Sequence, residues 1–86
     1  MNQEGNNMDK SEIIKTNYEA RVNEVMGYQI NIDNYTLALQ KISELPQDER
    51  EELAEFEKQI TSLLASEKLE QKKSKIMLSV LKSQME

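Results

Sequence analysis

The sequence predicts an all-α protein: a long antiparallel two-helix hairpin, similar to a coiled coil, which we expect dimerisation to complete as a four-helix bundle. Glycine and proline are nearly absent, with two and one among 86 residues, whereas charged residues make up 31%. This composition is typical of long helices. Apolar residues recur every three or four positions in both halves of the chain, which indicates helices with one apolar face. The only proline, Pro46, lies between the two halves.

The N-terminal segment, residues 1–8, is polar, and we expect it to be a flexible tail before a single domain over residues 9–86. A start at Met8 is the alternative to a start at Met1, and the sequence does not decide between them. Asp9 is followed three residues later by Glu12, an aspartate-led variant of the capping box that marks a helix start. The first helix is therefore expected over about residues 10–44.

The first helix carries an apolar stripe that stays in phase for about four heptads. Its members are Ile14, Tyr18, Val22, Val25, Tyr28, Ile32, Tyr35, Leu39 and Ile42. Gly27 lies within this stripe, and a glycine costs about 1 kcal/mol in a helix interior. Because the stripe keeps its phase across Gly27, we favour a continuous helix with a weak point there over a break.

Pro46 marks the turn. Proline is favoured in the first turn of a helix, and the residue before it is pushed away from helical angles. We therefore expect a turn at about residues 45–46 and a second helix over about residues 47–84, with Asp48 and Glu49 in its positive first turn. No glycine or proline follows, so this helix is expected to be unbroken. A connection this short makes the two helices antiparallel neighbours.

Folding the chain at residues 45–46 brings together residues whose numbers add to 91 or 92. The expected pairs are Leu39–Leu53, Tyr35–Phe56, Ile32–Ile60, Tyr28–Leu63 and Ile14–Met77. The match is weakest in the middle, where Val22 and Val25 face residues 67–70. The predicted seam between the helices therefore consists of Ile14, Tyr18, Tyr28, Ile32, Tyr35, Leu39, Leu53, Phe56, Ile60 and Leu63.

A second set of apolar residues lies off this seam and is our candidate partner-binding surface. Its members are Ile13, Met26, Ile30, Leu37, Leu64, Leu69, Ile76, Met77, Val80 and Leu81. An isolated hairpin would leave them in water. It would then lack several kcal/mol of stabilisation, because burial of apolar area contributes about 25 cal/mol per Å². Contiguous exposed apolar patches usually mark interaction surfaces. The expected partner is a second copy in a homodimer, which we favour because twofold dimers are common, or a helical client.

Three further groups of residues invite functional readings, and for each we favour a structural one. The tyrosines Tyr18, Tyr28 and Tyr35 are expected at the core or its boundary rather than in a recognition ladder. The acidic run over residues 48–57 lacks the tight loop of a calcium site and reads as a solvated helix face. The lysines over residues 68–75 read as a solvated face with weak ion pairs rather than a surface for membrane or nucleic acid.

Methionine adapts to irregular partners, so the segment containing Met77 and Met85 is the favoured contact region.

Composition argues against several classes of function. The chain has no cysteine and no histidine, so the usual thiolate and imidazole ligands and the common neutral-pH base are missing. We therefore expect no catalysis, no metal and no cofactor. A net charge of −5 argues against nucleic acid, whose binding needs cationic side chains. No stretch approaches the ~18 apolar residues that a membrane span needs.

The start of the sequence gives an expectation for the location of the protein. The first ten residues lack the basic and apolar regions of a secretion signal. The expectation is a cytoplasmic protein, or one exported by a route that the sequence does not reveal.

These observations predict a small helical protein-binding module that serves as an assembly chaperone, adaptor or subunit for a helical partner. Two alternatives remain at this level. One is a structural, self-assembling coiled-coil scaffold element. The other is an inhibitor that acts by occupying a partner's surface or by acidic mimicry of nucleic acid through the start of the second helix.

Overall fold

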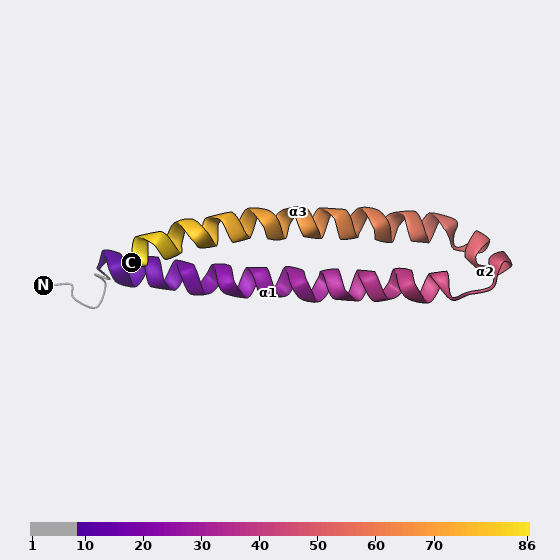
Figure 1. The fold of residues 1–86 in the computed structure, drawn as a ribbon, viewed down its shortest axis with the longest axis horizontal. Helices are drawn as coiled ribbons and strands as arrows, with labels where there is room; N and C mark the ends of the chain where they lie inside the picture. The colour runs from indigo at the N-terminus through magenta and orange to yellow at the C-terminus, as the bar shows by residue number, and fades with distance from the viewer. Residues whose placement is uncertain (1–8) are drawn as a thin grey trace, which may run out of the picture.

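The computed structural model describes residues 9–86, which form three helices: α1 (Lys10–Ser43), α2 (Gln47–Glu52) and α3 (Ala54–Met85). The helices α1 and α3 run side by side in opposite directions, and α2 lies at the end where they are joined (Figure 1). The result is a thin rod of 70 × 24 × 15 Å. The predicted all-α helical hairpin is confirmed. The expected flexible tail and the alternative start at Met8 lie outside the described residues.

Helix α1 begins after an aspartate cap. The carboxylate Oδ1 of Asp9 accepts a hydrogen bond of 2.9 Å from the backbone N–H of Glu12, which satisfies one of the unpaired donors at the helix start. The helix then continues through Gly27 to Ser43 without a break. The continuous apolar stripe of α1 therefore outweighs the low helix propensity of its single glycine.

The turn forms at the proline. Helix α1 closes with two tight bonds, from the N–H of Glu44 to the carbonyl of Lys41 and from that of Leu45 to Ile42, at 3.2 and 3.1 Å. Pro46 follows in an extended conformation, with φ −57° and ψ 154°, and α2 begins directly after it. The proline thus stops one helix and opens the next.

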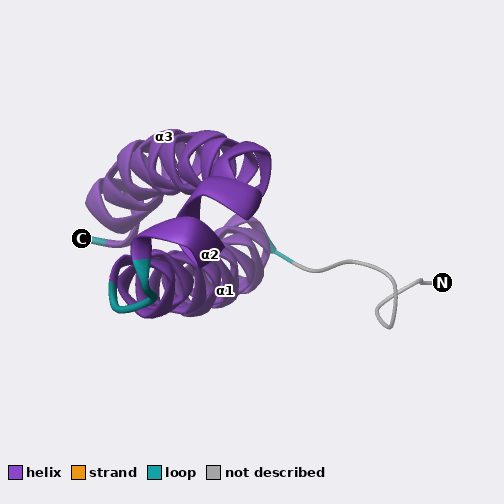
Figure 2. Ribbon diagram, turned by 90° about the vertical axis from the view of Figure 1, so that its right-hand side faces the viewer, coloured by secondary structure: helices purple, strands orange, loops and turns teal. Residues whose placement is uncertain are grey.

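The prediction of one unbroken helix from residue 47 to 84 is wrong. Leu53, at φ −99° and ψ 12°, separates α2 from α3. Its N–H still bonds to the carbonyls of Glu49 and Arg50 at 3.2 and 3.1 Å, so the bonding is nearly continuous while the axis changes direction. Viewed along the rod, α2 bridges the ends of the two long helices (Figure 2). The bend at Leu53 directs α3 back along α1. Packing of α3 against α1 therefore requires a bend in a segment that contains no glycine or proline.

The predicted register is also wrong. Asn31 hydrogen-bonds to Glu67 across the two helices at 2.7 Å, whereas folding at residues 45–46 would place it opposite Ile60 or Thr61. The cause is the connection, which runs over residues 44–53 and includes α2. The centre of the hairpin therefore falls inside α2. In each of the five predicted pairs, the residue from the second half of the chain is therefore about six residues away from the position that faces its predicted partner. Six residues correspond to roughly 9 Å along a helix.

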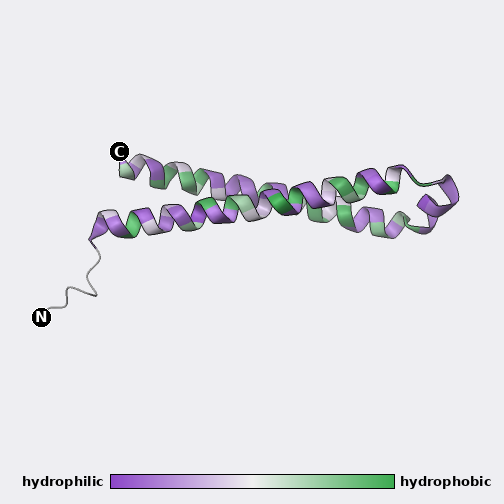
Figure 3. Cartoon of the chain, turned by 90° about the horizontal axis from the view of Figure 1, so that it is seen from below, coloured by the Kyte–Doolittle hydropathy of each residue, from purple (hydrophilic) through white to green (hydrophobic). Residues whose placement is uncertain are grey.

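The core of the described chain is thin. Only three apolar side chains are buried, Ile32, Ile42 and Ile60, and two polar side chains, Gln71 and Ser74, are buried with them. Apolar and polar residues alternate along both long helices (Figure 3). Two helices have one shared seam, so most of each helix surface faces outward.

Candidate protein-binding surface

The face of α3 that meets α1 is defined by burial at intervals of three and four residues. The buried and half-buried residues at this spacing are Glu57, Ile60, Leu64, Glu67, Gln71, Ser74, Leu78 and Leu81, and Glu70 is half-buried beside them. This is the spacing of a coiled-coil seam. Polar residues occupy its middle, apolar residues lie on both sides of them, and the acidic Glu57 stands at the end nearest the turn.

The predicted seam agrees with this face on α1 and departs from it on α3. All six predicted residues of α1 are buried or half-buried: Ile14, Tyr18, Tyr28, Ile32, Tyr35 and Leu39. On α3, Leu53 and Ile60 are as well. The placement of Phe56 and Leu63 in the seam is wrong, because they are 46% and 45% exposed. The positions facing α1 are one residue further along, at Glu57 and Leu64.

The middle of the seam holds a polar network. The hydroxyl of Ser74, which is buried, donates to Oε1 of Glu24. The same carboxylate oxygen accepts a 2.9 Å hydrogen bond from the guanidinium of Arg21, which also lies 3.5 Å from the Ser74 hydroxyl. The hydrogen bond from Ser74, together with the nearby positive charge of Arg21, holds the pKa of Glu24 below its usual value despite partial desolvation. A carboxylate thus remains ionised at the seam.

A second part of this network lies one turn closer to the hairpin end. The side-chain amide of Gln71 donates to the backbone carbonyl of Val25 at 3.2 Å and to Oε1 of Gln29 at 2.9 Å. Asn31 and Glu67 bond across the helices beyond it. We call the side chains of Arg21, Glu24, Gln29, Asn31, Glu67, Gln71 and Ser74 the polar layer. It satisfies the groups that the seam buries, as buried polar groups require.

Most of the predicted partner-binding residues are exposed in the hairpin. The exposed ones are Ile13, Met26, Ile30, Leu37, Leu69, Ile76, Met77 and Val80. The assignment of Leu64 and Leu81 to the outer surface is wrong, since both are half-buried in the seam. Leu78, which sequence reasoning missed, is half-buried there too. The burial of Leu78 could have been predicted from spacing, because Leu78 continues the alternation of three- and four-residue intervals through the polar positions 71 and 74.

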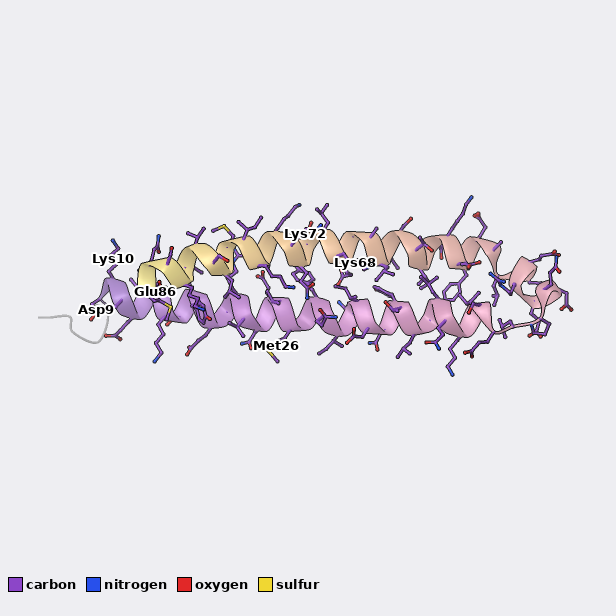
Figure 4. All side chains as sticks on the ribbon, viewed as in Figure 1. Asp9, Lys10, Met26, Lys68, Lys72 and Glu86 are labelled. Atoms are coloured by element: carbon purple, nitrogen blue, oxygen red, sulfur yellow. The ribbon has the colours of Figure 1, made fainter. Side chains whose placement is uncertain are left out.

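The first of two exposed apolar surfaces is the outer face of α1, formed by Met26, Ile30 and Leu37. These side chains are 56%, 60% and 53% exposed. Ile30 follows Met26 by four residues and precedes Leu37 by seven, so all three lie on one side of the helix. In Figure 4 the side chain of Met26 points away from α3. This face is therefore free to meet another molecule while the seam stays closed.

The second surface is the α3 flank, which we define by the exposed apolar residues Phe56, Leu63, Met77 and Val80. They lie beside the seam on the side where Glu24 and Asn31 approach α3. There Met77 and Leu81 line a shallow hollow of about 400 Å³ together with Asn17, Ala20, Arg21 and Glu24. Leu69 and Ile76 lie next to the flank, on the back of α3. The sequence analysis assigned Phe56 and Leu63 to the seam and Met77 and Val80 to the partner-binding surface, whereas the structure places all four on one flank of α3.

Charged residues lie beside these surfaces and, at Glu70 and Lys73, between the apolar residues of the α3 flank. The ion pairs of the described chain join near neighbours: Arg21–Glu24, Arg50–Glu57, Lys58–Glu55 and Lys73–Glu70. Pairs of this exposed kind contribute about 0–1 kcal/mol each. Among residues 9–86, no three acidic side chains converge closely enough to hold a metal ion. Within the same range, no helix has the length and apolar content to cross a membrane.

Comparison with known proteins gives no match at any level. No protein-family model matches the chain. No curated protein and no solved structure matches it either. The surface itself is therefore the basis for assigning a function.

Proposed function

We propose that this chain is a small helical protein-binding module that acts as an assembly chaperone, adaptor or subunit for a helical partner. One observation carries the proposal. Among residues 9–86, three apolar side chains are buried and eleven large ones are exposed. Exposed apolar residues that gather on one face usually mark a contact surface. A partner that covers them supplies the burial that the hairpin alone lacks.

The outer face of α1 has the form that a helical partner requires. Its apolar side chains recur at helical spacing, as do the anchors by which amphipathic helices pack together. Asp33 and Asn34 lie between Ile30 and Leu37 and border the apolar stripe, and Asp33 is held in place by a 2.9 Å hydrogen bond from Gln29. Apolar centres with polar rims are usual in protein interfaces. The α3 flank offers a second surface, suited to a client helix or to a second copy of the chain.

The experiment is capture of partners from the native source by immobilised chain in three forms. These are the wild type, the double variant Ile30→Asp/Leu37→Asp, and the control Asn23→Asp. Asn23 lies seven residues before Ile30, so the control adds one of the two negative charges at the same helical position without removing an apolar side chain. A client of the outer face is retained by the wild type and the control and is lost with the double variant.

A second measurement separates a client-binding module from a self-contained scaffold. Binding to the folded state raises its stability by about 2.7 kcal/mol when the free partner is at 100 times its dissociation constant. The purified client should therefore raise the unfolding midpoint of the wild type and leave that of the double variant unchanged. Equal retention of the same proteins by all three forms would contradict the proposal.

A further inference from the structure

Four lysines of α3 gather on one side of the helix. Three recur at intervals of seven residues, Lys68, Lys75 and Lys82, and Lys72 lies between the first two. Residues three, four or seven apart lie on one side of a helix, and all four of these lysines are exposed. Residues 71–85 contain no acidic residue. The result is a basic stripe from the middle of α3 to its end, to which the labelled Lys68 and Lys72 belong (Figure 4).

Helix α1 adds a fifth lysine to this side of the rod. The hydrogen bond between Asn31 and Glu67 sets the register of the two helices, and in this register Lys15 lies level with Lys82. Each of these two lysines directly follows a half-buried residue of the seam. In two antiparallel helices, the positions that follow facing seam residues lie on the same side. We call Lys15, Lys68, Lys72, Lys75 and Lys82 the lysine face.

The ammonium groups of the lysine face have no carboxylate partners within the described chain. Among residues 9–86, the lysines that form ion pairs are Lys58 and Lys73, and neither belongs to this face. The sequence analysis expected weak ion pairs for the lysines over residues 68–75, whereas only Lys73 has one. Like charges that lie near one another repel. The positive charge of the face is therefore available to an anionic partner, which would relieve this repulsion.

Two exposed apolar residues border the lysine face. Leu69 directly follows Lys68 and Ile76 directly follows Lys75, and both lie on the back of α3. Their side chains are 54% and 64% exposed, and Ile76 is the most exposed large apolar residue of the described chain. A partner that fits this side of the rod must accept ammonium groups and apolar side chains next to one another.

An anionic lipid surface meets both requirements. We propose that the lysine face binds such a surface, with the rod lying flat on it and with Leu69 and Ile76 entering the headgroup region. Helices with lysines beside apolar residues bind membranes in this way, through buried apolar area and attraction to anionic lipids. The long methylene chains of the lysines pack beside the apolar residues while their ammonium groups stay at the headgroups. Phosphates of a nucleic acid would neutralise the lysines but leave both apolar side chains in water.

The shape of the rod suits a flat surface. The chain forms a rod of 70 × 24 × 15 Å, and the lysines of α3 extend over about 21 Å of its length. Because they lie along a straight helix, a planar surface reaches all of them at once. The lysine face and the stripe of Ile30 and Leu37 lie on different sides of the rod, so this inference does not depend on the proposed function.

The net charge of −5 does not prevent this contact, because the two signs of charge are separated. Residues 44–57 carry a formal charge of −6 and residues 68–82 carry +4. Along α3, Lys75 is about 27 Å from Glu57, more than three times the Debye length of ~8 Å at physiological ionic strength. The local charge therefore determines the attraction, and the end of the rod opposite the turn approaches the lipid more closely.

The first test is co-sedimentation of the full chain with vesicles of phosphatidylcholine alone or with about a third of phosphatidylserine. We expect binding to the anionic vesicles only. Each lysine near such a surface strengthens binding about fivefold, so Lys68→Gln/Lys75→Gln should weaken it about 25-fold. The matched control Lys10→Gln/Lys41→Gln removes the same charge from other sides of α1 and should weaken binding by less than about threefold. Circular dichroism checks that the helix content of both variants is that of the wild type.

Three outcomes of this test overturn the inference. The first is equal binding of the wild type to both kinds of vesicle. The second is an equal loss in the two double variants, which would assign the attraction to net charge rather than to the lysine face. The third is binding to double-stranded DNA without binding to either vesicle, which would assign the face to nucleic acid.

The second test identifies the side of the rod that meets the lipid. Because the chain has no cysteine, an environment-sensitive fluorophore can be attached at Ser79→Cys or Asn34→Cys. Ser79 lies on the lysine face, seven residues after Lys72, and Asn34 lies on α1 away from it; both are exposed. Anionic vesicles should shift the emission at residue 79 to shorter wavelength and leave that at residue 34 unchanged. Equal shifts at the two sites, or a shift at residue 34 alone, would overturn the inference.

Discussion

The side-chain amide of Gln71 donates a hydrogen bond to the backbone carbonyl of Val25, 3.2 Å away on the opposite helix. This contact ties a side chain of α3 to the backbone of α1 at one height along the rod. An apolar side chain can slide along a neighbouring helix by a turn and find similar surroundings, whereas an amide cannot. Buried polar residues in coiled coils set the register in this way.

Truncation of this amide should therefore be costly. Gln71→Ala removes two hydrogen bonds and leaves a gap at a buried position, so we expect the free energy of unfolding to fall by about 1–2 kcal/mol. The measurement is urea denaturation followed by circular dichroism. Gln59→Ala, at an exposed position of the same helix, should change stability by less than about 0.5 kcal/mol. Equal effects at the two positions would show that the polar layer contributes nothing specific.

The exposure of Phe56 and the burial of Ile60 give a matched pair four residues apart. Ile60 is 7% exposed, so Ile60→Ala should cost about 2–4 kcal/mol, as buried truncations do. Phe56→Ala should cost less than about 1.5 kcal/mol in the monomer, because nearly half of the ring is already in water. Denaturation at protein concentrations that keep the chain monomeric checks both values. A larger loss at Phe56 than at Ile60 would place Phe56 in the seam, as the sequence predicts.

Gly27 offers a stabilising substitution. A Cβ atom built at this position meets nothing within 4 Å, and the residue lies in the interior of α1. Gly27→Ala should raise the free energy of unfolding by about 0.5–1 kcal/mol through helix propensity. Thermal denaturation would show this as a higher midpoint. An unchanged or lower midpoint would mean that the glycine is needed for a close approach by another molecule.

The lowered pKa of Glu24 predicts a pH dependence. A carboxyl group with a lower pKa in the folded state stabilises that state above its ordinary pKa of 4.5, and this stabilisation is lost as the pH falls through the folded-state value. Ser74→Ala removes the main cause of the shift. The difference in unfolding midpoint between wild type and Ser74→Ala should therefore be largest near pH 7 and shrink below pH 4.5. A constant difference would assign the effect of Ser74 to packing alone.

The first helix and the interruption at Pro46 were predictable from sequence because their signals do not compete, whereas the length of the whole connection was not. The apolar stripe of α1 has a single phase from Ile14 to Ile42, Asp9 caps it, and Pro46 interrupts the chain once. Each local preference agrees with the final fold. The boundaries therefore follow from capping, periodicity and the geometry of proline.

The second helix was less predictable because it carries two apolar stripes that share Ile60. One runs through Phe56 and Leu63, the other through Leu64 and Leu78. Sequence apolarity favours the first, but the structure places the second against α1. The choice depends on the bend at Leu53 and on bonds between residues far apart in the chain, such as those of Gln71. Neither leaves a local signal, so the register and part of the predicted surface were wrong.

The three apolar side chains that are buried among residues 9–86, Ile32, Ile42 and Ile60, all lie between the polar layer and the turn. Beyond that layer, toward the chain termini, the seam is closed only by half-buried residues such as Tyr18 and Leu78. Local opening should therefore start at the termini and stop at the polar layer, so amide protons of residues 10–20 and 76–85 should exchange with deuterium sooner than those of residues 28–42. The helices α1 and α3 would then separate first at the end of the rod opposite the turn and stay together next to the turn.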